Sequence, residues 1–149
     1  MSDKAKMILS TLEDIIFSIE LIQKRFVNIH NSDDFLANDN GMEKLDSISM
    51  RLMAIGEGFK NIDKLTDKKL LVQYPTIDWK GVKGIRDILL HHYFDLDAET
   101  IFSICDDYLN ELLLVAKQMN EVEQKKNVKK KALLDFLGEF GEGNLGDTK

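Results

Sequence analysis

Apolar residues recur at steps of three and four along most of the chain, which is the spacing of one face of an α-helix. The first such run extends from about Ser2 to His30 and predicts a long amphipathic helix. A second run extends from about Met42 to Lys64, and Gly56 and Gly58 lie inside it. Glycine lowers helix stability by about 1 kcal/mol relative to alanine. Two glycines in one helix therefore indicate close packing against a neighbouring element.

The second half of the chain predicts further helices. One runs from Trp79 to about Tyr93 with Asp78 as its N-cap, and the next is capped by Asp97 and runs to about Glu123. A basic stretch (125–131), a short terminal helix (132–140) and a frayed tail then follow. No segment alternates convincingly between apolar and polar residues. We therefore expect an all-α, up-and-down bundle of about four main helices plus a short C-terminal helix. The expected domain covers 1–124, and 125–149 forms an appended segment.

Composition places the chain among soluble globular proteins. It has 149 residues, of which 44% are hydrophobic and 31% are charged. It has no apolar run of transmembrane length, and its N-terminus does not resemble a signal peptide. The single Cys105 lies in an apolar helical pattern, is expected to be a small buried side chain, and cannot form a disulfide within one chain. These features predict a cytoplasmic protein. The net charge of −6 means that any nucleic acid must be met locally, by a few cations.

The third predicted helix carries the candidate chemistry. Arg86, His91 and Tyr93 form the pattern R-x-x-x-x-H-x-Y near its C-terminal end. Arginine binds phosphate as a planar, always-charged group, and histidine moves protons near neutral pH. An arginine and a histidine are the minimum set for cleaving RNA without a metal. The spacing alone is a weak motif.

The helical period, at about 100° per residue, divides this helix into two sides. Its expected core face consists of Val82, Ile85, Ile88, Leu89, His92 and Tyr93. Lys83, Gly84, Asp87 and His91 fall on the other side, and Arg86 lies at the border. Leu90 and Phe94 are apolar but lie off the core face, so this face is expected to pack against a second subunit.

The same period relates the candidate side chains to one another. Asp87 precedes His91 by four residues, so its carboxylate can orient the imidazole. Arg86 and His91 lie about 140° apart around the helix, so one copy of the helix does not point both side chains easily at one small group. Pairing this helix with its symmetry mate in a dimer brings two such sets into one cleft.

Several segments together resemble a known family. They are Ile55-Gly56-Glu57, residues 74–79 (Tyr-Pro-Thr-Ile-Asp-Trp), residues 84–87 and residues 91–97. Over roughly Lys4 to Met119 the sequence resembles the HepT-like branch of the HEPN superfamily. In that family the motif arginine is most often followed by asparagine, and Asp87 is a mild departure that leaves its role open.

This resemblance implies an all-α homodimer that acts as a metal-independent endoribonuclease toxin of a type II or related toxin–antitoxin system. It places Arg86 and His91 in a cleft at the dimer interface. It also implies a small MNT-type nucleotidyltransferase antitoxin as the partner, which silences the toxin by adenylylating the motif tyrosine, here Tyr93. No cofactor is implied.

The sequence leaves several residues with two interpretations. Glu57 either orients Arg86 or is an ordinary surface carboxylate, and Tyr93 is either a modification target or an interface residue. His92 is expected to be a buried histidine satisfied by hydrogen bonds. The five lysines of 125–131 either contact RNA or a partner, or form a solvated face. Three scattered histidines and one cysteine predict no metal site.

Two other functions remain open at this stage. The first is a non-catalytic helical module that dimerises and binds a nucleotidyltransferase, and the second is a regulatory helical protein that binds a nucleotide. The RNA substrate, whether tRNA, mRNA or rRNA, is not determined by the sequence.

Overall fold

The regular structure of the chain is helical. A computed structural model describes residues 1–91, 94–95 and 97–147, with side chains up to residue 139, and this part contains no strand. The helices are α1 (Asp3–Phe26), α2 (Asp39–Leu65), α3 (Trp79–His91), α4 (Ala98–Ser103) and α5 (Leu109–Asp147). Short 3₁₀ turns lie at Ser32–Phe35 and Leu71–Gln73, and a π-helical turn at Ile104–Tyr108 joins α4 to α5. The prediction of an all-α bundle is confirmed.

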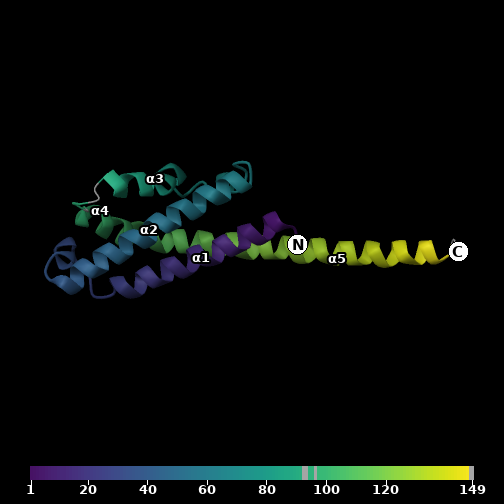
Figure 1. Cartoon of the computed structure of the whole chain (residues 1–149), viewed down its shortest axis with the longest axis horizontal. Coiled ribbons are helices and arrows are strands. Elements are labelled where there is room, and N and C mark those ends of the chain that lie inside the picture. The colour runs from purple at the N-terminus through teal and green to yellow at the C-terminus, as the bar shows by residue number, and fades with distance from the viewer. Residues whose placement is uncertain (92–93, 96, 148–149) are drawn as a thin grey trace.

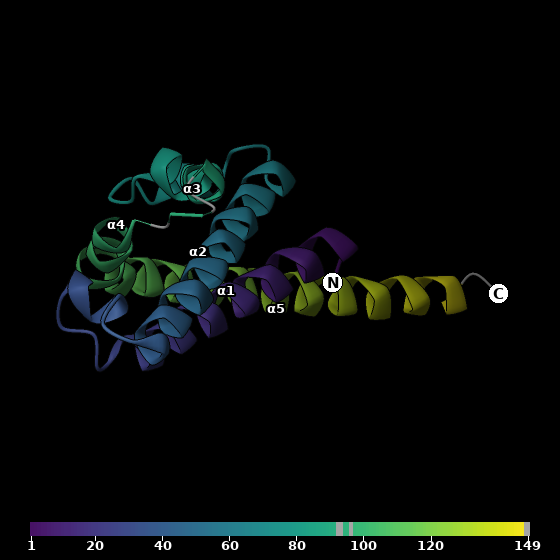
Figure 2. The same cartoon turned by 60° about the vertical axis from the view of Figure 1, so that its left-hand side comes forward.

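Three long helices form the body of the bundle, and α3 lies on its outer side. Helix α1 packs against both α2 and α5, while α3 packs against α2 (Figures 1 and 2). Apolar side chains at the three- and four-residue steps of α1 and α2 are buried in this layer. They include Leu12, Ile19 and Ile22 of α1 and Ile48, Leu52, Ile55 and Phe59 of α2, each no more than 1% exposed.

The helix starts follow from capping side chains. Asp78 Oδ1 accepts a hydrogen bond from the Gly81 amide at 3.0 Å, which caps α3. Asp97 Oδ1 accepts hydrogen bonds from the amides of Glu99 and Thr100 at 3.1 and 3.2 Å, which caps α4. Each cap satisfies amide groups that have no partner within the first helical turn. Both caps are the ones that the sequence predicts.

The two glycines of α2 lie where neighbouring helices come closest. A Cβ atom at Gly56 would lie 2.8 Å from the backbone carbonyl oxygen of Val82 in α3. A Cβ atom at Gly58 would lie 2.9 Å from side-chain carbons of Ile15 in α1. The expectation that these glycines permit close packing is confirmed at both positions.

The C-terminal end differs from the prediction. Helix α5 continues without a break through the basic stretch, the expected short helix and most of the expected tail, to Asp147. The reason is that residues 125–137 consist mainly of good helix formers and contain no proline. Residues 138–147 also belong to the helix although four of them are glycines, each of which lowers helix stability by about 1 kcal/mol. Both views show α5 running on past the start of α1 (Figures 1 and 2).

Cys105 is buried as expected, with 5% of its surface exposed. Burial, together with the nearby Asp106 carboxylate, raises the pKa of its thiol to about 12. The thiol therefore stays protonated at neutral pH and behaves as a small apolar side chain. In the part of the chain that the structure describes, no helix is both long and apolar enough to cross a membrane.

Candidate active site

The start of α3 is anchored by Trp79. Its ring packs against Phe59 of α2 with 4.9 Å between the ring centroids. Its indole N–H donates a hydrogen bond to the Tyr74 carbonyl at 2.9 Å. Trp79 is thus a packing residue at the start of α3, and its position orients the helix that carries the motif.

Two further contacts hold α3 against α2. Ile85 and Leu89 are 8% and 5% exposed and face the core. The Lys83 ammonium lies 2.8 Å from a carboxylate oxygen of Asp63, which is itself buried. The sequence placed Lys83 on the polar side of its helix and did not predict this pair. An acidic residue directly after the core residue Ile62 was the available signal.

Arg86 lies on the exposed side of α3 and is held by Glu57. The Arg86 guanidinium Nη1 is 3.5 Å from Glu57 Oε1, and the two side chains are 51% and 37% exposed. An ion pair this exposed contributes less than about 1 kcal/mol to stability. Its effect is therefore to restrict where the guanidinium points. Of the two interpretations of Glu57, the structure favours contact with Arg86.

His91 is the last residue of α3, and its side chain is exposed. Asp87, one turn earlier, is also exposed, but no hydrogen bond or ion pair between these two described residues is present. Arg86 and His91 point in directions about 140° apart around the helix. A single copy therefore does not bring them together. His92 and Tyr93 lie outside the described residues, so their predicted positions on the core face stay predictions.

The buried face of α3 is narrower than the sequence predicts. Ile88 is 50% exposed, although the sequence placed it on the core face. The physical reason is that α3 packs mainly on α2, so only Ile85 and Leu89 are covered fully. Leu90, which the sequence placed off the core face, is 46% exposed as expected.

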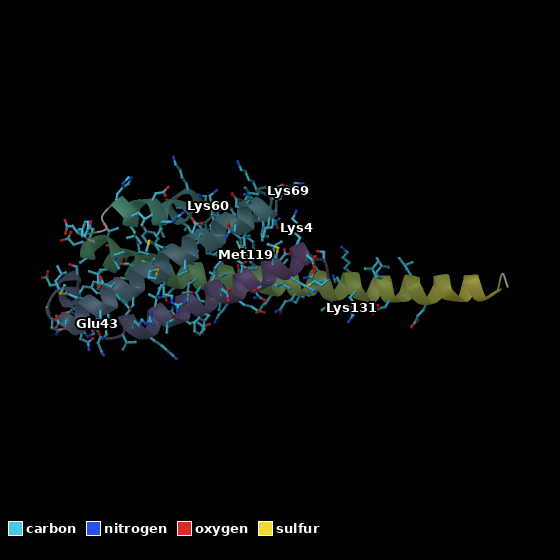
Figure 3. All side chains as sticks on the ribbon, in the orientation of Figure 1. Lys4, Glu43, Lys60, Lys69, Met119 and Lys131 are labelled. Carbon is cyan, nitrogen blue, oxygen red and sulfur yellow. The ribbon has the colours of Figure 1, made fainter. Side chains whose placement is uncertain are left out.

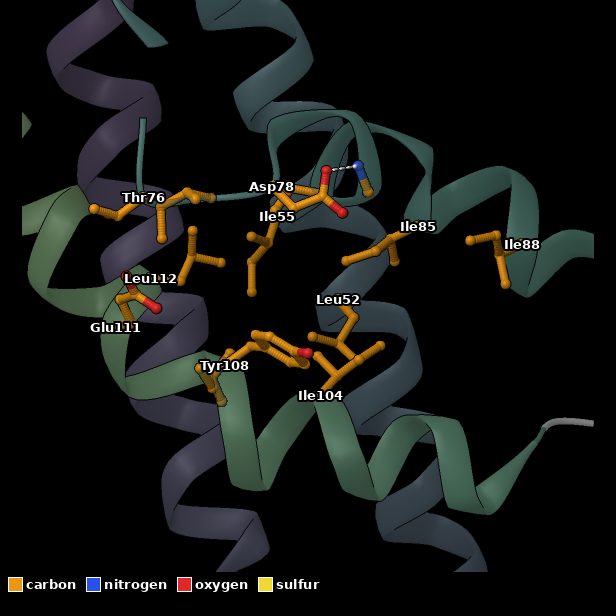
Figure 4. Close-up of a pocket in the computed structure, with 14 residues that line it drawn as sticks. Leu52, Ile55, Thr76, Asp78, Ile85, Ile88, Ile104, Tyr108, Glu111 and Leu112 are labelled. Atoms are coloured by element: carbon orange, nitrogen blue, oxygen red, sulfur yellow. Dashed lines mark hydrogen bonds between the residues drawn. The ribbon is translucent and has the colours of Figure 1, made fainter. Parts of the chain in front are cut away.

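Ile88 lines an apolar groove of about 370 Å³ between α3 and the α4–α5 segment. Figure 4 shows Ile85, Ile88, Ile104 and Tyr108 around this groove, with Leu52 and Ile55 of α2 at its floor. Its acidic lining residues are Asp78 and Glu111. The sequence did not predict the groove, because its lining comes from segments far apart in the chain. The motif of α3 thus borders an open apolar surface.

A second hollow near α4 is acidic. It is lined by Asp33, Asp95, Asp97 and Glu99, among other residues. Within the described residues, no group of three or more His, Cys, Asp or Glu side chains is arranged to hold a metal ion. The cationic side chains of α3 are Lys80, Lys83 and Arg86.

Comparison with known proteins places the chain among ribonucleases. A family model described as Ribonuclease HepT-like matches residues 15–119, which is more than half of the chain. A protein of Methanocaldococcus jannaschii, provisionally named as an RNase, is 34% identical over 97 residues, which are 65% of this chain and 68% of that protein. The Probable ribonuclease HepT of Thermococcus cleftensis is 35% identical over 91 residues, which are 61% of this chain and 76% of that protein.

A second M. jannaschii protein combines a gamma-glutamylcyclotransferase with a provisionally named RNase in one chain. It is 30% identical over 119 residues, which are 79% of this chain and 50% of that protein. No solved structure gives a significant match.

Proposed function

The chain belongs to the HepT-like ribonuclease family, and on that premise we propose that it is an endoribonuclease whose catalytic residues are Arg86 and His91. The observation that carries this proposal is that both side chains lie exposed on the helix of the motif, with Glu57 restricting Arg86. Neither side chain is needed inside the core, so both are free to meet a substrate.

The proposed reaction uses the nucleophile that RNA itself carries. The 2′-oxygen attacks the adjacent phosphorus atom, and the bond from phosphorus to the 5′-oxygen breaks. His91 takes the proton from the 2′-hydroxyl or gives one to the departing 5′-oxygen. The Arg86 guanidinium donates charge-assisted hydrogen bonds to the phosphoryl oxygens, on which negative charge grows in the transition state. The products are a 2′,3′-cyclic phosphate and a 5′-hydroxyl.

A homodimer completes the site in this proposal. Arg86 and His91 of one copy lie about 140° apart around α3, so one copy does not point both side chains at one phosphate. Ile88 and Leu90 are about half exposed on the same helix. Pairing α3 with its mate through the side that carries Leu90, which lies between Arg86 and His91 around the helix, buries Leu90 and brings Arg86 of one copy toward His91 of the other. Asp87 and Glu57 then act as positioning residues around the cleft.

A direct test is the chemistry of the cleaved ends. We expect the purified chain to cut RNA to fragments with 2′,3′-cyclic phosphate and 5′-hydroxyl ends, and to do so equally well in EDTA. A DNA strand of the same sequence lacks the 2′-hydroxyl and should remain intact. Fragment ends can be identified by mass spectrometry. Cleavage of the DNA, or 3′-hydroxyl ends, would contradict the proposed mechanism.

Regulation by a partner is the second part of the proposal. The chain acts as the toxin of a toxin–antitoxin pair, and an MNT-type nucleotidyltransferase silences it by transferring AMP from ATP to the Tyr93 phenol oxygen, releasing pyrophosphate. Tyr93 falls two residues after the end of α3. AMP there would obstruct the motif and add negative charge that repels RNA.

Tyr93→Phe should therefore escape silencing. Co-expression with the partner enzyme should add the mass of one AMP to the wild-type chain and stop its RNA cleavage, while Tyr93→Phe stays unmodified and active. Tyr108→Phe is the matched control, because Tyr108 is an exposed tyrosine elsewhere in the chain. Silencing of Tyr93→Phe would assign another mode of inhibition. If the unmodified wild-type chain is inactive on RNA, a non-catalytic module that docks the partner becomes the better interpretation.

A further inference from the structure

Positive charge is concentrated around α3 and the end of α2, although the chain as a whole is acidic. Residues 57–87 carry seven Lys or Arg and five Asp or Glu side chains, which is a net charge of +2. The whole chain has 20 and 26 such side chains, so the remainder carries 13 and 21, a net charge of −8. A polyanion is therefore attracted to this region and repelled by much of the rest.

Two lysines of this region share one side of α2 with the residue that contacts Arg86. Glu57, Lys60 and Lys64 are separated by three and four residues, so they lie within about 60° of arc around the helix. Because Arg86 Nη1 is 3.5 Å from Glu57 Oε1, the guanidinium lies at the start of this line of side chains. Two further lysines follow in the turn after α2. The term basic row is used below for four residues: Lys60, Lys64, Lys68 and Lys69.

The ammonium groups of the basic row are available to an outside partner. All four lysines are exposed, and among the described residues no ion pair involves any of them. Figure 3 shows Lys60 and Lys69 on the side of the bundle where α3 lies. Two acidic side chains of α2 beside the row already have cationic partners. Glu57 contacts Arg86, and Asp63 contacts Lys83 at 2.8 Å.

The C-terminal end of α3 leads to the opposite charge. Asp95 follows the motif residue His91 by four positions and lines the acidic hollow near α4. Asp33, Asp97 and Glu99 line the same hollow. A strand of phosphates that leaves the motif is thus repelled on this side and attracted along α2.

On the premise of the proposed nuclease function, we propose that the basic row binds the RNA backbone on one side of the scissile phosphate. The strand passes from Arg86 along α2, where Lys60 and Lys64 bind successive stretches of backbone. These two lysines are about 6 Å apart along the helix axis, and their flexible stems let each ammonium follow a phosphate. Phosphate contacts fix the path and the affinity of the strand but do not read its bases.

A second basic segment, residues 125–131 of α5, competes for this role. It contains five lysines, and Lys126 is paired with Glu123 at 3.4 Å. Figure 3 shows Lys131 on the part of α5 that extends past the bundle, away from Lys60. The basic row is favoured because it begins beside the contact between Glu57 and Arg86. One strand can therefore occupy the row and the motif together.

RNA that cannot be cut makes the test independent of catalysis. A labelled 2′-O-methyl RNA oligonucleotide keeps the phosphates but lacks the attacking hydroxyl, and its binding to the full chain can be followed by fluorescence anisotropy. Lys60→Gln/Lys64→Gln should weaken binding by about 10- to 30-fold at about 0.1 M salt. It should also lower the slope of log Kd against log salt concentration by about 1.4, because each phosphate contact to a single strand contributes about 0.7.

Lys125→Gln/Lys129→Gln is the matched control. These two lysines are also exposed and have the same four-residue spacing on an α-helix. This variant should bind the oligonucleotide like the wild type and keep its salt dependence. Circular dichroism checks that both double variants stay helical. A loss of affinity in the control pair but not in Lys60→Gln/Lys64→Gln would overturn the proposal and place the RNA on α5.

Failure of this proposal can be told apart from failure of the nuclease function. Normal binding by Lys60→Gln/Lys64→Gln, with a wild-type chain that cleaves RNA, would refute the basic row and leave the nuclease intact. A wild-type chain that does not cleave RNA, while the same variant still loses affinity and salt dependence, would support the row and refute the nuclease. A wild-type chain that does not bind the oligonucleotide even at low salt would overturn the row.

Discussion

Replacing either Arg86 or His91 by alanine should lower the rate of RNA cleavage by about 100- to 10,000-fold. Removing His91 takes away the proton-transfer group, and removing Arg86 takes away the cation that stabilises the charged transition state. Both side chains are exposed, so neither change opens a cavity or leaves a buried partner unsatisfied. We therefore expect the melting temperature of each variant to match the wild type while single-turnover cleavage falls.

Matched controls separate the site from general charge effects. His30→Ala removes an exposed histidine outside the motif, and Lys80→Ala removes an exposed cation on the same helix as Arg86. Both should cleave RNA at nearly the wild-type rate. Glu57→Gln should have an intermediate effect, because it loosens the Arg86 guanidinium without removing it. Full cleavage by both motif variants would refute the catalytic assignment.

A cleft shared between two copies predicts that the two inactive variants complement each other. If Arg86 of one copy acts with His91 of the other, a mixture of Arg86→Ala and His91→Ala chains forms some heterodimers in which one cleft has lost both groups and the other has lost neither. Such a mixture should regain measurable cleavage, although each variant alone is inactive. Absence of any recovery, in a mixture shown to exchange subunits, would place both groups of a working site in one copy.

The sequence predicts local features of this molecule well because local physics decides them. Asp78 and Asp97 cap helices through amides two or three residues away, and the apolar periodicity of α1 and α2 is a property of each segment alone. Features that depend on how helices are placed were not predictable in the same way. Ile88 follows the period of a core residue, yet it is half exposed because it lines an open groove between α3 and the α4–α5 segment.

The same distinction between local features and helix placement applies to the candidate site. The residue types and spacing of the motif identified Arg86 and His91, and the resemblance of the flanking segments named the family. The contact between Arg86 and Glu57 joins residues 29 positions apart, so the sequence left it open until α2 and α3 were placed. The Lys83–Asp63 ion pair and the apolar groove have the same origin, since each needs the relative placement of two helices.

The placement of α3 against α2 depends on their close approach at Gly56. Gly56→Ala should therefore lower both the stability of the protein and its RNA cleavage. The added methyl carbon would lie 2.8 Å from the Val82 carbonyl oxygen, so α3 must move away from α2. Overpacking of this kind typically costs about 1–3 kcal/mol, which exceeds the gain of about 1 kcal/mol from replacing a helical glycine. Because Glu57 and Arg86 lie beside this contact, the shift should also reduce RNA cleavage. Chemical denaturation and the cleavage assay measure the two effects.

Gly84→Ala provides the comparison that isolates the cause. Gly84 also lies within a helix, but a methyl group there would meet no atom within 4 Å. This change removes the same backbone freedom without a clash, so it should raise the free energy of unfolding by about 0.5–1 kcal/mol. The two substitutions are chemically the same, yet they should change the free energy of unfolding in opposite directions. Equal effects at both positions would mean that helix propensity, rather than the close approach of α2 and α3, governs Gly56, and the geometry of the motif would then need another source of support.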